Sequence, residues 1–206
     1  MDSQKLIETL HLISQRIEKE KDFLTSLDND IADGDHGINL NRGFQEVDKA
    51  IANSSDKLPG DILKMVGMTL LSKVGGASGP LFGTAFLKSA MYLKDKKEID
   101  IDDFLACLNE AIEGIKTRGK AIYGEKTMLD SMIPSLEEMK KTLTLGKSEK
   151  EVLEAGVKKA YEGIEFTKTI VATKGRASYC GERSIGHQDP GATSYTYILE
   201  EIAKVI

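Results

Sequence analysis

The sequence predicts an all-α protein in which eight helices form an antiparallel up-and-down bundle or barrel. Apolar residues recur at helical spacing in eight successive stretches of the chain. Short groups of Gly, Pro, Ser, Asn or Asp separate these stretches, and no convincing pair of strands is found. With 206 residues, the whole chain (1–206) is expected to form a single domain with a substantial core.

The first four helices are predicted from their apolar stripes. Residues 3–27 place apolar side chains at steps of three, four and seven, beginning with Leu6. The same spacing predicts helices over residues 38–53, 61–74 and 81–92. Turn residues separate these helices, so consecutive helices are expected to lie antiparallel.

The fifth and sixth helices are predicted over residues 102–117 and 128–143. Apolar residues mark one face of the fifth helix. Thr127 has the side chain of a typical N-cap for the sixth helix, and Pro134 is expected to kink it.

The last two helices carry clear start signals. Ser148 and Glu151 have the spacing of a capping box, which opens a long helix extending to about residue 174. Asp189 is expected to be the N-cap of the final helix and Pro190 its first residue.

Composition and charge exclude several functional classes. The net charge of −5 and the lack of a basic stripe argue against a nucleic-acid partner. No run of about 18 apolar residues predicts a membrane span, and the N-terminus does not lead into a signal-peptide core. The two cysteines lack metal-site spacing and suit a reducing compartment, so a cytoplasmic protein is expected.

An acidic cluster contains the aspartates at positions 28, 30, 33 and 35, followed directly by His36. Two like charges about 4 Å apart repel by roughly 1 kcal/mol in water and about 4 kcal/mol at an effective dielectric constant near 20. Converging carboxylates therefore call for a cation, and Mg²⁺ prefers such oxygen ligands. The spacing does not fit a calcium EF-hand. A solvated loop between two helices remains the alternative.

Two later segments suggest an anion partner. Glycines within residues 75–80 permit a nest of backbone N–H groups, although close helix packing would also explain them. The connection over residues 175–191 is unusually long for a loop without a function. In it, Arg176 has a fork suited to phosphate, whereas Arg183 is interpreted as surface charge and His187 as a hydrogen-bonded structural residue.

The positions of these segments along the chain support a common site. The acidic cluster, the glycine segment, the connection over residues 119–128 and the connection over 175–191 join helices one to two, three to four, five to six and seven to eight. In an up-and-down arrangement, these alternate connections fall at the same end of the bundle. The four segments are therefore predicted to form one site.

Together, these segments resemble the nucleotide-binding subunit of dihydroxyacetone kinases over nearly the whole chain. The combination is specific although each part alone is weak, and one departure is Glu125, where the family pattern has Asp. The resemblance is carried by Asp28, Asp33 to Gly37, Asn39 to Phe44, Gly75 to Gly83, Lys126 to Met128, Asp130, Gly175 to Ser178 and Gly186 to Ala192.

The resemblance implies an eight-helix barrel with a nucleotide site at one end. It implies that Asp28, Asp33 and Asp35 hold two Mg²⁺ ions at the phosphates of ADP or ATP. No catalytic side chain is assigned, since positioning and electrostatics are expected to drive phosphoryl transfer. The residues implied to bind the nucleotide are His36, Gly37, Ile38, Asn39, Ala77, Ser78, Gly119, Met128, Arg176, Asp189, Pro190 and Gly191.

Chain length separates two forms of the family. The ATP-dependent form fuses this domain to a dihydroxyacetone-binding domain, for which 206 residues leave no room. The stand-alone form implies a bound ADP that a phosphohistidine carrier of the phosphoenolpyruvate phosphotransferase system rephosphorylates. The phosphoryl group then passes to dihydroxyacetone on a separate kinase subunit. A kinase domain for another small acceptor, a Mg-nucleotide sensing or adaptor module, a metal-dependent phosphohydrolase and a homodimeric state all remain open.

Overall fold

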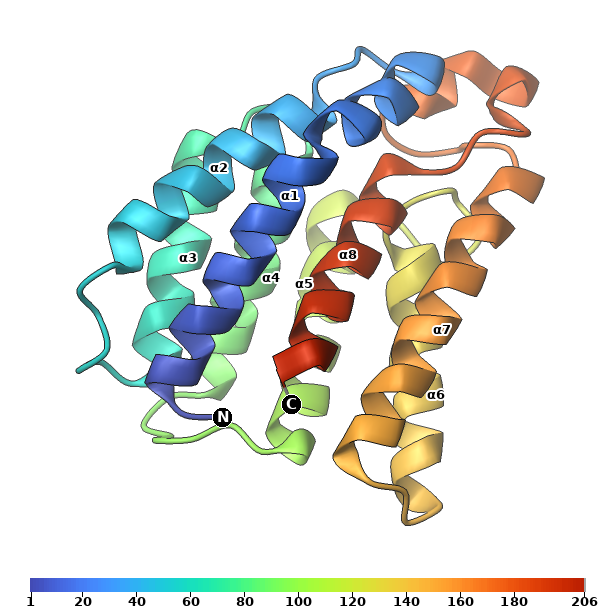
Figure 1. The fold of residues 1–206 in the computed structure, drawn as a ribbon. Helices are drawn as coiled ribbons and strands as arrows, with labels where there is room; N and C mark the ends of the chain where they lie inside the picture. The colour runs from blue at the N-terminus through green and yellow to red at the C-terminus, as the bar shows by residue number, and fades with distance from the viewer. Residues whose placement is uncertain (206) are drawn as a thin grey trace.

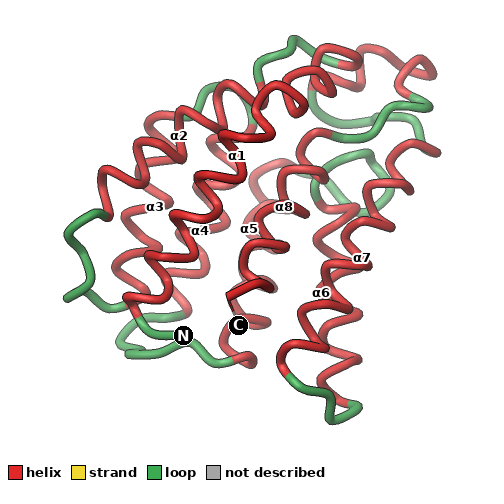
Figure 2. The backbone as a smooth tube through the Cα atoms, viewed as in Figure 1, coloured by secondary structure: helices red, strands yellow, loops and turns green. Residues whose placement is uncertain are grey.

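The computed structural model describes residues 1–205, and this part of the chain is helical with no strand (Figure 2). The prediction of an all-α fold is confirmed. The elements in chain order are α1 (Ser3–Ile31), α2 (His36–Ile51), α3 (Pro59–Lys73), α4 (Ser78–Tyr92), α5 (Ile101–Gly119), α6 (Leu129–Thr144), α7 (Glu149–Thr169), the 3₁₀ segment η1 (Arg176–Ser184) and α8 (Pro190–Val205).

The helices form a closed ring with up-and-down connections (Figure 1). Each of the eight α-helices packs against the next one in the chain, and α8 packs against α1 to close the ring. The apolar stripes face inward, and the fully buried side chains include Leu10 and Ile17 of α1 and Phe44 of α2. Because consecutive helices run in opposite directions, alternate connections lie at one end, as the sequence predicts.

The two helices beside the acidic cluster differ from the prediction: α1 is longer, and α2 has the predicted length but starts and ends two residues earlier. Helix α1 continues to Ile31, so Asp28 lies in its last turn and not in the following loop. Ile31 is buried and stands one helical step after Leu27, which explains the extension. Helix α2 begins at His36, two residues earlier than predicted.

The second half of the chain also departs from the prediction in places. Helix α7 ends at Thr169 instead of near residue 174, because Ile170 has extended backbone dihedrals. Residues 176–184, predicted as a loop, form η1, which is interrupted where Gly181 adopts a positive φ of 55°. Met128, and not Thr127, is the N-cap of α6, and it makes no side-chain capping bond.

Two capping predictions are confirmed. Ser148 and Glu151 form the capping box at the start of α7, with both reciprocal hydrogen bonds present. The backbone N–H of Ala192 donates to Asp189 Oδ2 over 2.6 Å, so Asp189 caps α8 and Pro190 is its first residue. These caps fix where the connections before α7 and α8 end.

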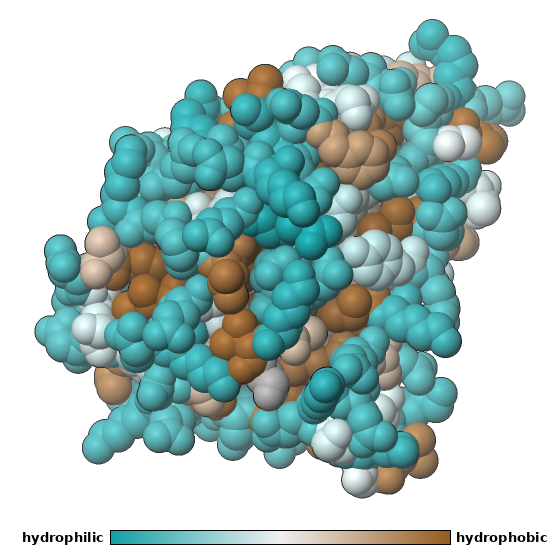
Figure 3. Space-filling model, in the orientation of Figure 1, coloured by the Kyte–Doolittle hydropathy of each residue, from teal (hydrophilic) through white to brown (hydrophobic). Residues whose placement is uncertain are grey.

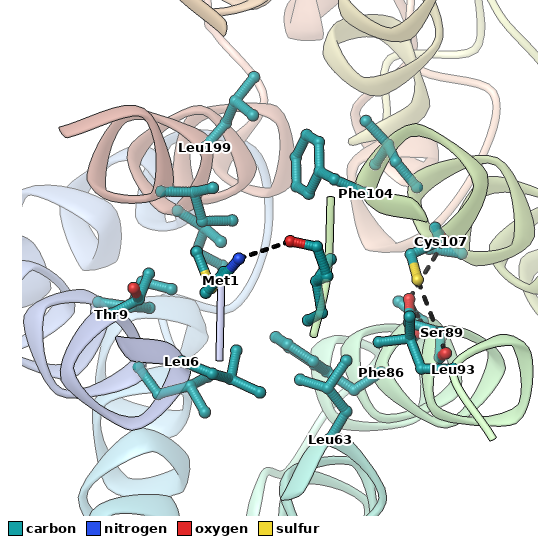
Figure 4. Close-up of a pocket in the computed structure, with 18 of the residues that line it drawn as sticks. Met1, Leu6, Thr9, Leu63, Phe86, Ser89, Leu93, Phe104, Cys107 and Leu199 are labelled. Atoms are coloured by element: carbon teal, nitrogen blue, oxygen red, sulfur yellow. Dashed lines mark hydrogen bonds between the residues drawn. The ribbon is translucent and has the colours of Figure 1, made fainter. Parts of the chain in front are cut away.

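Inside the ring, an apolar cavity of about 150 Å³ lies near the end that carries both chain termini (Figure 4). Leu6, Phe86, Phe104 and Leu199 are among its lining residues. The α-ammonium group of Met1 donates to the carbonyl oxygen of Ile99 over 2.6 Å beside this cavity. This cavity is separate from the end of the ring that carries the acidic cluster.

The outer surface is mainly polar on the face shown in Figure 3, with hydrophobic side chains visible between helices. Among the described residues, no helix is both long enough and apolar enough to cross a membrane.

Candidate functional site

A cavity of about 300 Å³ opens at the end of the ring opposite the chain termini. Each of the four connections singled out in the sequence contributes to its lining: Asp35 from the first, Ala77 from the second, Ala121 from the third and Arg176 from the fourth. The prediction that these segments meet is therefore confirmed, and it follows from the alternation of helix direction.

Three carboxylates of the acidic cluster converge at this cavity. Asp28, Asp33 and Asp35 each offer an oxygen, and these oxygens all lie within 4.8 Å of one another. Asp28 is buried in the last turn of α1, where carboxylate charge also faces the negative end of the helix dipole. Such a set of oxygen donors fits a hard divalent cation such as Mg²⁺.

Hydrogen bonds hold the acidic cluster in place. Asp28 Oδ2 accepts from the backbone N–H of Asp35 over 2.8 Å and from that of His36 over 3.2 Å. The start of α2 is thereby tied to the end of α1. Arg176 supplies the nearby positive charge, because its Nη1 pairs with Asp33 and lies 3.9 Å from Asp35 Oδ2.

His36 joins three helices at the floor of the cavity. Its Nδ1 lies 2.9 Å from the hydroxyl of Ser78 at the start of α4, and its Nε2 lies 3.0 Å from the hydroxyl of Ser194 in α8. Burial lowers the pKa of His36 to about 4, although the charge of Asp28 acts to raise it. The imidazole is therefore neutral at physiological pH and serves to hold the three helix ends together.

The first turns of α2, α4 and α8 all line the cavity, through His36, Ser78 and Pro190. The N-terminal end of a helix carries partial positive charge and N–H groups without helical partners. Three such ends beside a trio of carboxylates combine an anion site with a cation site. This arrangement suits a phosphate chain bridged to a divalent metal ion.

A second buried network supports the loop that carries Thr127 and Met128, which line the cavity. Asp130, at the start of α6, accepts from the backbone N–H groups of Gly124 and Thr127. Burial raises the pKa of Asp130, while these hydrogen bonds lower it. Burial likewise raises the pKa of Asp189 to about 7, and the N–H of Ala192 counteracts this. Asp130 thus shapes the loop that presents Met128 to the cavity.

Comparison with known proteins decides the family. Residues 30–204 match the family model described as the DAK2 domain. This chain belongs to the DAK2 domain family. A relative from Escherichia coli (strain K12), "PEP-dependent dihydroxyacetone kinase, ADP-binding subunit DhaL", is 45% identical over 89% of this chain and 88% of its own length. A second relative, from Listeria innocua serovar 6a, is named "PEP-dependent dihydroxyacetone kinase 2, ADP-binding subunit DhaL" and is 41% identical over 100% of this chain and 98% of its own length.

Solved structures agree on the fold. The dihydroxyacetone kinase of C. freundii in its native form superposes with a TM-score of 0.74 at 24% identity. The match covers 97% of this chain and 34% of that chain, so this DAK2 domain spans about a third of the solved kinase. A second structure of the C. freundii enzyme, in complex with AMP-PNP and Mg²⁺, also gives a TM-score of 0.74, at 22% identity.

The structure of this DAK2 domain brings most of the predicted site residues to one cavity. Their individual roles toward metal and nucleotide stay predictions. The predicted residues that line the cavity are Asp28, Asp33, Asp35, His36, Ala77, Ser78, Gly119, Met128, Arg176, Asp189, Pro190 and Gly191.

Three predicted nucleotide-binding residues do not line the cavity. A Cβ at Gly37 would lie 2.1 Å from the carbonyl oxygen of Lys21, so this glycine permits close packing of α2 on α1. Ile38 is 51% exposed. Asn39 is buried and accepts from Arg42 Nη2 over 2.7 Å.

Sequence reasoning assigned no binding role to three cations that line the cavity, namely Arg118, Lys126 and Lys174. Arg118 and Lys174 lie close in sequence to residues that were assigned, Gly119 and Arg176, which is the only signal that pointed to them. Lys126 belongs to a motif that carries the family resemblance, but that motif does not indicate burial, and the side chain is only 1% exposed.

Proposed function

We propose that this chain is the nucleotide-binding subunit of a phosphoenolpyruvate-dependent dihydroxyacetone kinase. In this proposal it keeps Mg-ADP as a bound cofactor, accepts a phosphoryl group from a phosphohistidine carrier, and passes that group to dihydroxyacetone on a partner subunit. The products are dihydroxyacetone phosphate and the regenerated ADP-bound protein. The observation that carries the proposal is the convergence of Asp28, Asp33 and Asp35 beside the first turns of three helices.

In this proposal, some residues of the cavity bind the metal ion and others bind the nucleotide. Asp28, Asp33 and Asp35 would hold Mg²⁺, and two ions fit the proposal best, since they would neutralise charge on both the transferred and the retained phosphates. The N–H groups in the first turns of α2 and α4, together with Ser78, would bind phosphate oxygens. Arg176 pairs with the carboxylate of Asp33 and would add a planar fork toward the phosphoryl group.

The rest of the cavity suits the nucleoside. Gly119 has no side chain, and a Cβ there would lie 3.3 Å from Leu81 Cδ2, so an apolar side chain lies beside an uncovered stretch of backbone in the cavity lining. Met128 and Pro190 also line this region. Such a surface accepts a purine ring by dispersion and exclusion of water.

The acceptor is proposed to bind on another chain. The relatives that match at nearly full length are named as ADP-binding subunits, and the C. freundii kinase chain is about three times as long as the part matched here. A dihydroxyacetone-binding subunit and a phosphohistidine carrier are therefore the proposed partners, in the cytoplasm. A homodimer has no observation in its favour among the described residues.

The first test is to identify the small molecule that remains bound after purification. Denaturing the purified protein should release ADP in a near-equimolar amount. Protein that arrives empty and turns over free ATP rapidly would contradict the cofactor role.

The second test is reconstitution with the carrier system, phosphoenolpyruvate, the dihydroxyacetone-binding subunit and dihydroxyacetone. Triose phosphate should form only when this protein is present. A sensing or adaptor module would give no product, a phosphohydrolase would release phosphate without any partner, and a kinase for another acceptor would act only when that acceptor and its subunit are supplied.

A further inference from the structure

Lys126 is one of the largest fully buried side chains in the protein, with 1% of its surface exposed. Lysine is almost never fully buried unless its charge is partnered. Here the ammonium nitrogen donates to three backbone carbonyls, those of Thr167, Ile170 and His187. All three of its N–H donors are therefore used on the main chain.

The acceptors belong to two separate segments. Thr167 lies in the last turn of α7 and Ile170 is the C-cap, where carbonyl oxygens lack helical partners and carry the negative end of the dipole. His187 belongs to the connection that leads into α8. A single ammonium group thus joins the end of α7 to the segment that precedes α8, and Figure 1 shows these two helices side by side.

Two further bonds fix the same junction. The backbone N–H of Gly186 donates to the carbonyl oxygen of Lys168 over 2.8 Å. The backbone N–H of Asp189 donates to Thr167 Oγ1 over 3.0 Å. Residues 186–189 are therefore attached to the end of α7 at both ends of the segment, with Lys126 between them.

Lys126 lies in the cavity wall, next to Thr127 and Met128, which also line the cavity. It adopts a positive φ of 60° immediately before Thr127 and Met128. A Cβ at Gly191 would lie 3.4 Å from the Cβ of Met128, so the start of α8 and this loop are in close contact. Moving either segment would change the shape of the cavity wall that both of them form.

We propose that Lys126 is a positioning residue: its buried ammonium group holds residues 186–189 against the end of α7 and so sets the α8 wall of the nucleotide cavity. This inference rests on the proposed function, because it assigns the wall to ADP binding. Burial lowers the pKa of the Lys126 ammonium group, and the charges of Asp189 and Asp130 act in the opposite direction.

The test compares Lys126→Met with a matched control, Ser131→Ala. Methionine keeps an unbranched side chain out to Cε but lacks the ammonium group, so the three carbonyls lose their donor. Ser131 is equally buried and donates to the carbonyl oxygen of Ala160 between α6 and α7, outside the cavity lining. Each protein is stripped of ligand, and ADP affinity in Mg²⁺ is measured by calorimetry together with amide hydrogen exchange.

Lys126→Met should weaken ADP binding at least tenfold and speed exchange of the Gly186 and Asp189 amides at least tenfold. Ser131→Ala should leave both quantities within about twofold of wild type, even where it lowers the melting temperature. ADP affinity within twofold of wild type in Lys126→Met would overturn the inference. Weakened ADP binding with unchanged exchange at both amides would also overturn it, since Lys126 would then act on the ligand directly.

A milder variant covers the case in which Lys126→Met does not fold. Thr167→Val removes the hydroxyl that accepts from the Asp189 amide and donates to the Ile164 carbonyl within α7, and it should weaken ADP binding severalfold while speeding exchange at Asp189. Wild-type values for both would contradict the inference. A wild-type protein that binds no ADP would refute the proposed function, and the exchange rates would still decide whether Lys126 holds residues 186–189.

Discussion

Replacing Asp35 with asparagine removes one of the three converging carboxylates. The hydrogen bond from Asp35 to Asp28 is kept, because its donor is the backbone N–H of Asp35 and not the side chain. Oxygens of Asp28, Asp33 and Asp35 lie within 4.8 Å. At that separation two charges repel by about 0.9 kcal/mol in water and about 3.5 kcal/mol at an effective dielectric constant of 20. The change therefore removes two repulsions from the metal-free protein.

One attraction is lost in exchange. Arg176 Nη1 lies 3.9 Å from Asp35 Oδ2, and its attraction is similar in size to one of the repulsions. Both side chains are about half exposed, so solvent screens every one of these interactions. The net effect on metal-free stability is expected to lie between zero and a gain of about 1 kcal/mol, or up to roughly 4 °C in melting temperature.

Ligand binding should change in the opposite direction. Without one of its proposed oxygen ligands, Mg²⁺ should bind less tightly, and Mg-dependent ADP affinity should fall at least tenfold, which is about 1.4 kcal/mol. Thermal unfolding in EDTA and calorimetric titration of ADP in Mg²⁺ measure the two effects separately. Asp30→Asn is the matched control, since Asp30 lies in the same segment but pairs with His187.

If the carboxylates hold a metal ion, the effects of Asp35→Asn on metal-free stability and on Mg-ADP affinity have opposite signs. A variant Asp35→Asn that loses more than about 2 kcal/mol of stability in EDTA, yet binds Mg-ADP as tightly as wild type, would show that the carboxylates serve the fold and not a metal.

Three other predictions follow from the same geometry. Arg176→Ala should weaken ADP retention more than Arg183→Ala, because only Arg176 lines the cavity, and equal ADP content after purification would contradict this. Gly37→Ala should lower the free energy of unfolding by about 1–3 kcal/mol in urea titrations, since its Cβ would overlap the Lys21 carbonyl and overpacking typically costs this much; a change within about 0.5 kcal/mol, as for a neutral surface substitution, would refute it. Burial raises the pKa of Asp189 to about 7, above its unfolded value of 3.8, so its contribution to stability is most favourable below pH 4 and declines as pH rises to 7. The stability of Asp189→Asn relative to wild type should therefore be more than about 1 kcal/mol higher at pH 8 than at pH 4. Stability curves of the two proteins that run parallel with pH would argue against a buried carboxylate.

Much of the site was accessible from the sequence because its chemistry is local. The acidic cluster can be recognised from the sequence alone, because Asp28, Asp33 and Asp35 carry the same charge and lie close together along the chain. The alternation of helices then predicts that four distant connections meet, since a helix that returns must bring every second connection to the same end. Asp189 and Pro190 likewise mark the start of α8 through preferences that act within four residues.

Other features were decided only by tertiary structure. His36 has hydroxyl partners 42 and 158 positions away, and no local pattern records that it is buried between them. Gly37 and Asn39 belong to the family motif, yet the rotation of α2 against α1 turns them away from the cavity.

Amino-acid sequence by itself determined the eight apolar stripes, the family and the acidic cluster, because each depends on residues that are neighbours along the chain or one helical turn apart. Closure of the ring, the end of α1 beyond Asp28 and the burial of Lys126 were decided by the tertiary structure. They depend on which carbonyls, amides and side chains the packed helices bring within hydrogen-bonding distance, and those partners lie far apart in the sequence.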